Sequence, residues 1–142
     1  MVAILVALGP VLVANLSACN KGTGEPTLLA ARGQFYVADI PVPAKFKLEE
    51  QKSNYVYTAG RRRVKNLYEG KASSLAVRNF YVHHMTLSGW ELTDDTLANN
   101  VFTIKYRKNE ERCEIRIERT PRGLGHVTQI WATIRSESDT NP

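Results

Sequence analysis

The chain has 142 residues, which is enough for one domain with its own core. Its hydrophobic fraction of 43% and charged fraction of 23% are those of an ordinary globular protein, and its two cysteines exclude a disulfide framework. The formal net charge of +5 favours anionic partners, without choosing between nucleic acid, phospholipid and acidic polysaccharide.

The N-terminal residues 1–18 contain no charged side chain and consist largely of two apolar runs, 2–8 and 11–14. This length suits the apolar region of a signal peptide and falls short of the roughly 20 residues of a membrane-spanning helix. The sequence Leu16-Ser17-Ala18-Cys19 follows, and it resembles the lipobox of bacterial lipoprotein precursors. The resemblance implies cleavage after residue 18 and a mature protein that begins at a diacylglyceryl-modified Cys19, anchored through its lipid chains.

The same resemblance implies a location in the cell envelope, lipid-anchored and facing the periplasm. Asn20 carries no inner-membrane aspartate signal, so the outer membrane is favoured if the host has two membranes. A signal peptide normally opens with a basic residue, whereas the first basic residue here is Lys21. Two alternatives stay open: a start further upstream, or an apolar core segment with a buried Cys19, in which case pairing with Cys113 is worth testing.

The composition changes after the lipobox. Residues 20–27 are polar and include two glycines and a proline, so residues 19–38 are expected to be a lipidated cysteine and a flexible tether. The sequence Ile40-Pro41-Val42-Pro43 enforces an extended backbone, because each proline fixes its own φ and restricts its neighbour. We therefore expect a single domain at 39–136 and a frayed tail at 137–142.

Hydrophobic patterns predict short strands at 46–50 and 55–58, a strand at 61–68 and a helix at 74–88. Ser73 or Ser74 is the expected N-cap of the helix, Gly89 its stop, and its apolar face carries Val77, Phe80, Tyr81, His84, Met85 and Ser88. A loop follows, and three alternating strands are expected near 102–107, 113–118 and 127–134. This pattern predicts an α+β fold: a mostly antiparallel sheet with one amphipathic helix packed across one face.

Three short motifs carry a second resemblance. They are the proline-rich segment 39–43, the strand end Tyr68-Glu69-Gly70, and a helix that runs from Phe80 through Met85 to Gly89-Trp90. Over roughly residues 39–135 the chain is similar to small bacterial envelope lipoproteins of uncharacterised function. The motifs are structural, with Trp90 expected to cap the core edge, and the resemblance implies no activity.

The candidates for chemistry favour structural roles. His83 and His84 diverge by about 100° on a helix, and no Cys-x-x-Cys or His-x-x-x-His pair exists, so no metal site is expected. Cys113 alternates with core residues and is interpreted as a small buried hydrophobe. The acidic pairs Asp94-Asp95 and Glu110-Glu111 are interpreted as solvated loop and turn residues. No catalytic residue is assigned, and no cofactor beyond the covalent lipid is expected.

The basic residues give the best indication of a binding surface. An open sheet face that joins cations to an aromatic platform would suit an anionic envelope polymer, a lipid head group or an acidic protein. The alternative is that Glu114 and Glu118 neutralise their cross-strand neighbours and the face is simply soluble. Nucleic acid is not an expected partner of an exported lipoprotein. The candidate surface residues are Arg61, Arg63, Lys105, Arg116 and Trp131.

The leading functional hypothesis is a non-enzymatic, membrane-anchored binding or assembly module whose ligand is unknown. The alternative is an envelope enzyme whose active site cannot be identified from the sequence. A deep pocket with His84 or His126 beside a carboxylate would favour the enzyme, whereas a flat basic and aromatic surface would favour the binding module.

Overall fold

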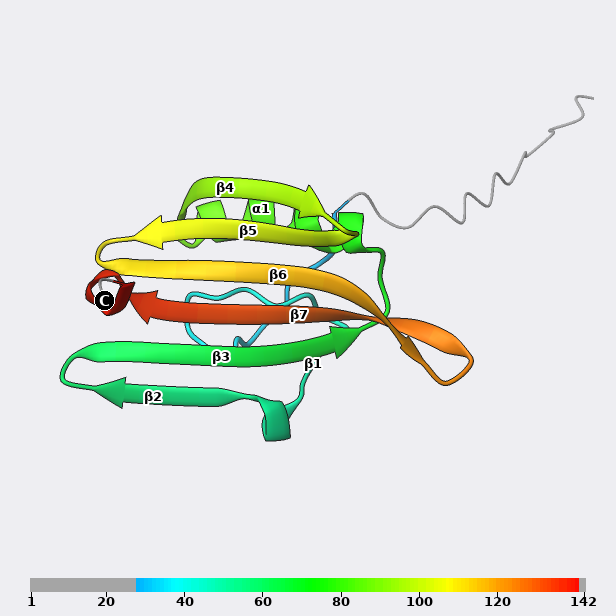
Figure 1. The fold of residues 1–142 in the computed structure, drawn as a ribbon, viewed down its shortest axis with the longest axis horizontal. Helices are drawn as coiled ribbons and strands as arrows, with labels where there is room; N and C mark the ends of the chain where they lie inside the picture. The colour runs from blue at the N-terminus through cyan, green and yellow to red at the C-terminus, as the bar shows by residue number, and fades with distance from the viewer. Residues whose placement is uncertain (1–27, 141–142) are drawn as a thin grey trace, which may run out of the picture.

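The computed structural model describes residues 28–140, so the predicted signal peptide, Cys19 and the first part of the tether lie outside the described residues. Within this range seven strands form one antiparallel sheet in the order β1-β3-β7-β6-β5-β4, with β2 also paired to β3 (Figure 1). One α-helix packs on the sheet, which confirms the predicted α+β architecture. The elements are β1 (Lys47–Leu48), η1 (Glu50–Lys52), β2 (Asn54–Thr58), β3 (Arg61–Gly70), α1 (Ser74–Leu87), β4 (Glu91–Ala98), β5 (Val101–Lys108), β6 (Glu111–Arg122), β7 (Gly125–Ser136) and η2 (Glu137–Thr140).

The helix α1 forms where its caps and its apolar face predict it. Ser73 is the N-cap, and its hydroxyl accepts a hydrogen bond from the backbone N–H of Ala76 at 3.1 Å. Gly89 follows the C-cap with a φ of 83°, a left-handed conformation that favours glycine. The face that packs on the sheet consists of Ala76, Val77, Phe80, Tyr81 and Met85. None of the helices in the described part of the chain has the length and apolar character needed to cross a membrane.

The inner face of the sheet has a second cover besides the helix. Helix α1 contacts β4, β5 and β6, while the segment 28–46 runs behind β7 and β3 (Figure 1). Val37, Ile40, Val42 and Phe46 of this segment are buried in the core. Leu29 and residue 31 also pack against it, so the packed chain begins about ten residues before the domain boundary expected at residue 39. The later part of the expected tether is thus part of the core.

Strand β4 is a correction to the sequence prediction, which placed Asp94-Asp95 in a loop. Residues 91–98 pair with β5, with a register shift between Leu92 and Asp94. Asp94 forms an ion pair with Lys105 on one face, and Asp95 with Arg78 of the helix on the other. The acidic composition disfavours a strand by propensity, but charges and an irregularity are what an exposed edge strand uses to avoid further pairing.

The end of β3 explains the motif Tyr68-Glu69-Gly70. The ring of Phe46 lies directly on the backbone at Gly70, where a Cβ atom would come within 2.6 Å of Cγ of the ring. A side chain at this position would therefore displace a buried aromatic ring. The strand expected at 46–50 is shortened to β1, and η1 occupies residues 50–52.

A network of charged groups attaches the N-terminal segment to the sheet. The Asp39 carboxylate accepts two hydrogen bonds from Arg62 at 2.7 and 2.8 Å and one from Lys108 at 2.9 Å. The same guanidinium donates to Glu111 at 2.7 and 2.6 Å. Bidentate, charge-assisted bonds of this kind are the strong ones, and they hold Arg62 between two carboxylates. Arg62 is thus a structural residue.

Trp90 completes this network from the helix end. Its indole N–H donates to the backbone carbonyl of Asp39 at 3.1 Å, and its side chain is 1% exposed, in agreement with the expected role at the core edge. Lys108 donates to the carbonyl of Ser88 at 2.9 Å, and its ammonium lies 5.6 Å from the Trp90 ring centroid. The network therefore joins the N-terminal segment, three strands and the C-terminal end of α1, where a cation is favoured.

We predict that Asp39 makes the stability depend on acidity. Burial raises the pKa of this carboxyl, but hydrogen bonds from Arg62 and Lys108 outweigh it and lower the pKa from 3.8 to about 2. The charged carboxylate therefore contributes about 2 kcal/mol to the free energy of unfolding above about pH 4, and this is lost as the pH falls towards 2. Urea unfolding of the protein and of Asp39→Asn from pH 6 to pH 2 measures it.

The expected result is a difference of about 2 kcal/mol at pH 6 that disappears near pH 2. The matched control is Asp94→Asn, which removes an exposed ion pair and is expected to cost less than about 1 kcal/mol. A difference between Asp39→Asn and the unchanged protein that is independent of pH would contradict this assignment.

Candidate anion-binding face

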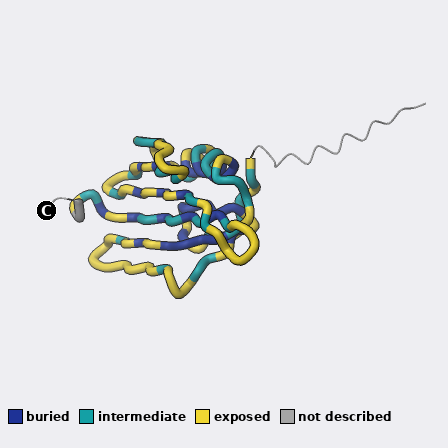
Figure 2. Tube along the Cα trace, turned by 45° about the vertical axis from the view of Figure 1, so that its right-hand side comes forward, coloured by how far each residue is buried: buried dark blue, intermediate teal, exposed yellow. Residues whose placement is uncertain are grey.

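One face of the sheet, called the outer face below, carries neither α1 nor the segment 28–46 (Figure 1). Buried residues alternate with exposed or half-buried residues along β5, β6 and β7, as expected for strands covered on one side (Figure 2). The outward residues on this face include all five surface candidates from the sequence: the exposed Arg61 and Arg63 on β3, Lys105 on β5 and Arg116 on β6, and the half-buried Trp131 on β7.

The strand register aligns four arginines across this face. Arg107 lies opposite Arg112, and Arg112 lies opposite Arg135. Val64 is opposite Ile134, so the preceding Arg63 lies beside Arg135. Neighbouring strands are about 4.8 Å apart, and like charges directly opposite one another are destabilising. This line of Arg63, Arg135, Arg112 and Arg107, the arginine row, is therefore an unfavourable arrangement for stability alone.

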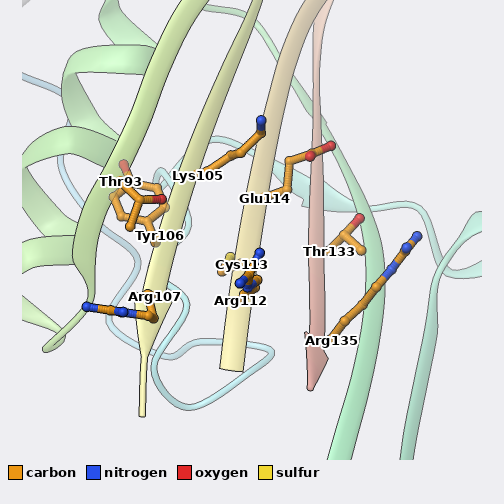
Figure 3. Close-up of a pocket in the computed structure, with 9 residues that line it drawn as sticks. All are labelled: Thr93, Lys105, Tyr106, Arg107, Arg112, Cys113, Glu114, Thr133 and Arg135. Atoms are coloured by element: carbon orange, nitrogen blue, oxygen red, sulfur yellow. The ribbon is translucent and has the colours of Figure 1, made fainter. Parts of the chain in front are cut away.

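A concavity of about 600 Å³ lies over three arginines of this row (Figure 3). Figure 3 shows Arg107, Arg112 and Arg135 following one another across neighbouring strands, with Lys105 and Glu114 above them. The side chains that line the concavity include four cations and one carboxylate, so the concavity is electropositive. Its lining residues are Thr93, Lys105, Tyr106, Arg107, Arg112, Cys113, Glu114, Thr133 and Arg135.

Exposed carboxylates neutralise only part of this charge. Arg107 binds Glu91 at 3.0 Å and Arg112 binds Glu137 at 2.6 Å, with side chains 43–68% exposed. Ion pairs this exposed contribute little and can exchange for another anion. Arg135 has no ion pair or hydrogen bond among the described side chains. It is the member of the row most available to a ligand.

Trp131 forms an aromatic platform beside the row. The ammonium of Lys65 lies 5.2 Å from its ring centroid, and Leu67 lies opposite it in the register. Leu67 is fully buried although it faces outward, so this part of the outer face has a small apolar centre of its own. Arg116 also lies opposite Trp131, but its guanidinium binds Glu118 at 3.0 Å.

The structure brings only part of the predicted surface together. Lys105 lines the concavity and Arg63 lies at the end of the row, whereas Arg61 lies near the β2–β3 turn and Arg116 beside the platform. Neither expected cross-strand neutralisation is found among the described residues: Glu118 binds Arg116 of its own strand, and Lys105 binds Asp94 at 3.2 Å in place of Glu114. Arg107, Arg112 and Arg135 are not among the surface candidates from the sequence, because only the strand register aligns them.

Of the remaining candidates for chemistry, Cys113 lines the concavity and the histidines lie outside it. The Cys113 thiol is buried in the core, and this burial raises its pKa. His84 packs on Phe80 with ring centroids 4.4 Å apart, and burial lowers its pKa, while His126 is exposed on the β6–β7 hairpin. Between residues 28 and 140, no group of three His, Cys, Asp or Glu side chains could hold a metal ion.

We predict that the arginine row reduces stability. Arg135→Gln removes one of the two inner charges of the row, so the free energy of unfolding should rise by about 0.5 kcal/mol at low salt. Urea unfolding at about 0.02 M and about 0.5 M sodium chloride measures this increase in the free energy of unfolding. The increase should be smaller at the higher concentration, because salt screens the repulsion. Arg119→Gln, an exposed arginine of the β6–β7 hairpin outside the row, serves as the control. A loss of stability in Arg135→Gln at both salt concentrations would show that the row is not repulsive.

Comparison with known proteins adds one match. The model of a family described as START domain-like matches residues 49–137, more than half of the chain. No curated protein and no solved structure matches the chain. The matched range includes β2 to β7, the helix α1 and all four residues of the arginine row.

Proposed function

The chain belongs to the START domain-like family, and from this membership we propose that it is a non-enzymatic binding module for an anionic ligand. The family suggests a ligand-binding module, and the outer face specifies the class of ligand. The observation that carries the proposal is the alignment of Arg107, Arg112 and Arg135 over a concavity of about 600 Å³.

The spacing of the row favours a ligand with several negative charges. The guanidinium groups originate on strands about 4.8 Å apart, so an extended polyanion lying across the strands meets several in succession. Each guanidinium can donate two parallel hydrogen bonds to a phosphate or carboxylate group. Binding also removes the repulsion within the row, while the exposed Glu91 and Glu137 are displaced into water. The repulsion that lowers the stability of the free protein is therefore relieved in the complex, which favours binding of the anion.

We predict that tripolyphosphate, used as a probe, binds the full-length protein. Arg135→Gln should weaken the binding about tenfold, because one charge-assisted contact contributes roughly 1.5 kcal/mol. Isothermal titration calorimetry measures it, and the affinity should fall as salt is added. Arg119→Gln keeps the same net charge as Arg135→Gln and should bind like the unchanged protein. Equal affinity of Arg135→Gln and Arg119→Gln for tripolyphosphate would show that the arginine row is not the binding site.

We also propose that this module is tethered to a membrane. The support is the lipobox resemblance of Leu16-Ser17-Ala18-Cys19. A diacylglyceryl group on Cys19 would supply two acyl chains, and about 0.8 kcal/mol for each buried methylene makes such an anchor stable. The module would then face the periplasm, at the outer membrane where the host has two membranes. A tether would keep the outer face near anionic envelope components.

We predict that the mature protein lacks residues 1–18 and carries acyl groups on Cys19. The intact mass of membrane-extracted protein from a bacterial host measures both changes. In Cys19→Ala the thiol that takes the lipid is absent, so neither the added acyl mass nor the removal of residues 1–18 should be found. An unlipidated mass for the unchanged protein would contradict the tether and leave the arginine-row proposal standing.

A further inference from the structure

Strand β2 is an open edge of the sheet. It pairs with β3, and no other strand between residues 28 and 140 pairs with it. All five of its residues are exposed, including Tyr55 at 55%, Val56 at 43% and Tyr57 at 65%. The sequence Asn54–Thr58 has high strand propensity and contains no charge, proline or glycine. These are the properties of an edge that accepts another strand.

The opposite edge of the sheet, strand β4, is protected against pairing with another strand. Strand β4 carries Glu91, Asp94 and Asp95 and has an irregular register. Inward-facing charges and irregularities are the usual means of preventing further pairing. The fold therefore protects one edge and leaves the other available.

The hairpin geometry indicates which backbone groups of β2 are available. Ala59 and Gly60 have φ values of 51° and 76° and form a two-residue turn that is closed by Thr58 and Arg61. The closing pair of such a turn is hydrogen-bonded, and alternate residues then direct their N–H and C=O groups to opposite sides. Thr58 and Val56 therefore bond to β3, while Tyr55 and Tyr57 direct their backbone groups to the open edge.

The two faces beside this edge differ in chemistry. On the inner side, Tyr55 borders a cavity of about 320 Å³, where the apolar surface of Tyr36, Val37 and Leu48 gives an apolar side chain of an added strand a place to pack. The rest of the lining is polar and consists of Glu50, Ser53, Asn54 and Asn66. On the outer side, β3 presents the exposed cations Arg61 and Lys65, and β2 contributes no carboxylate. This edge is therefore partly apolar on its inner face and cationic on its outer face.

We propose that β2 is a docking edge for an extended acidic segment of another protein, which adds to the sheet as a further strand. Its backbone would bond to Tyr55 and Tyr57, and its alternate apolar side chains would pack beside the same tyrosines. Its carboxylates would share the outer face with Arg61 and Lys65, a complementary charge. A second copy of this chain fits less well, because it would bring another set of cations to the edge.

The test uses two seven-residue peptides, one alternating valine with glutamate and the other valine with lysine. Each is titrated into the full-length protein, isotope-labelled and kept in solution with a non-ionic detergent, while backbone amide signals are recorded by NMR. The glutamate peptide is expected to shift the signals of residues 54–58, and the lysine peptide is not. Tyr57→Pro removes an outward N–H without touching the bonds to β3 and should abolish the shifts. Arg61→Glu should weaken binding about fivefold.

Each other outcome overturns the docking edge. Equal shifts with both peptides would remove the role of charge, and no shift in β2 would remove the site. Shifts of β2 that depend on protein concentration without peptide would identify a second copy as the occupant. Binding that survives Tyr57→Pro and is lost in Arg135→Gln would place the peptide on the arginine row. That last result separates the two proposals, because it supports the row and removes the edge.

Discussion

The Asp39 carboxylate is the group on which the arrangement of the domain depends. One helix covers only β4, β5 and β6, so the rest of a seven-stranded sheet would expose its apolar face without the segment 28–46. Asp39 fixes this segment through Arg62 and Lys108, and both partners are needed because a partly buried carboxylate loses contact with water. Trp90 then attaches the helix end to the same point. With the inner face covered in this way, the outer face is left free for polar groups.

The sequence predicts the elements whose apolar periodicity is local. The helix and the last three strands follow from side chains two, three or four positions apart. The N-cap Ser73 and the glycine that follows the C-cap, Gly89, lie directly at the two ends of the helix. Strand β4 does not follow, because its acidic residues contradict strand propensity and its position at the sheet edge is a tertiary property. The packing of residues 28–38 on the sheet does not follow either. The polar, glycine-containing stretch before it indicates a tether, and the contact with the sheet is a tertiary property.

The arginine row also depends on tertiary contacts that local sequence patterns do not predict. Alternation alone places Lys105, Arg116 and Trp131 on one face, but the arginine row requires knowing which residue of one strand lies opposite which residue of the next. That register is set by hairpin turns and core packing, and a shift of one residue would turn Arg112 towards the core. Arg62 illustrates the converse case. Its two carboxylate partners lie 23 and 49 positions away, so its structural role cannot be separated from the neighbouring basic residues by sequence alone.

The two tryptophans of the chain occupy different environments. Trp90 is 1% exposed and belongs to the core, whereas Trp131 is half-buried on the outer face, and each ring has a cation near it. Indole fluorescence depends on the polarity and the charges around the ring, so a ligand on the outer face is expected to change the emission of Trp131. Unfolding is expected to change the emission of both tryptophans. The native protein therefore contains a built-in optical means of separating binding from unfolding, without any added label.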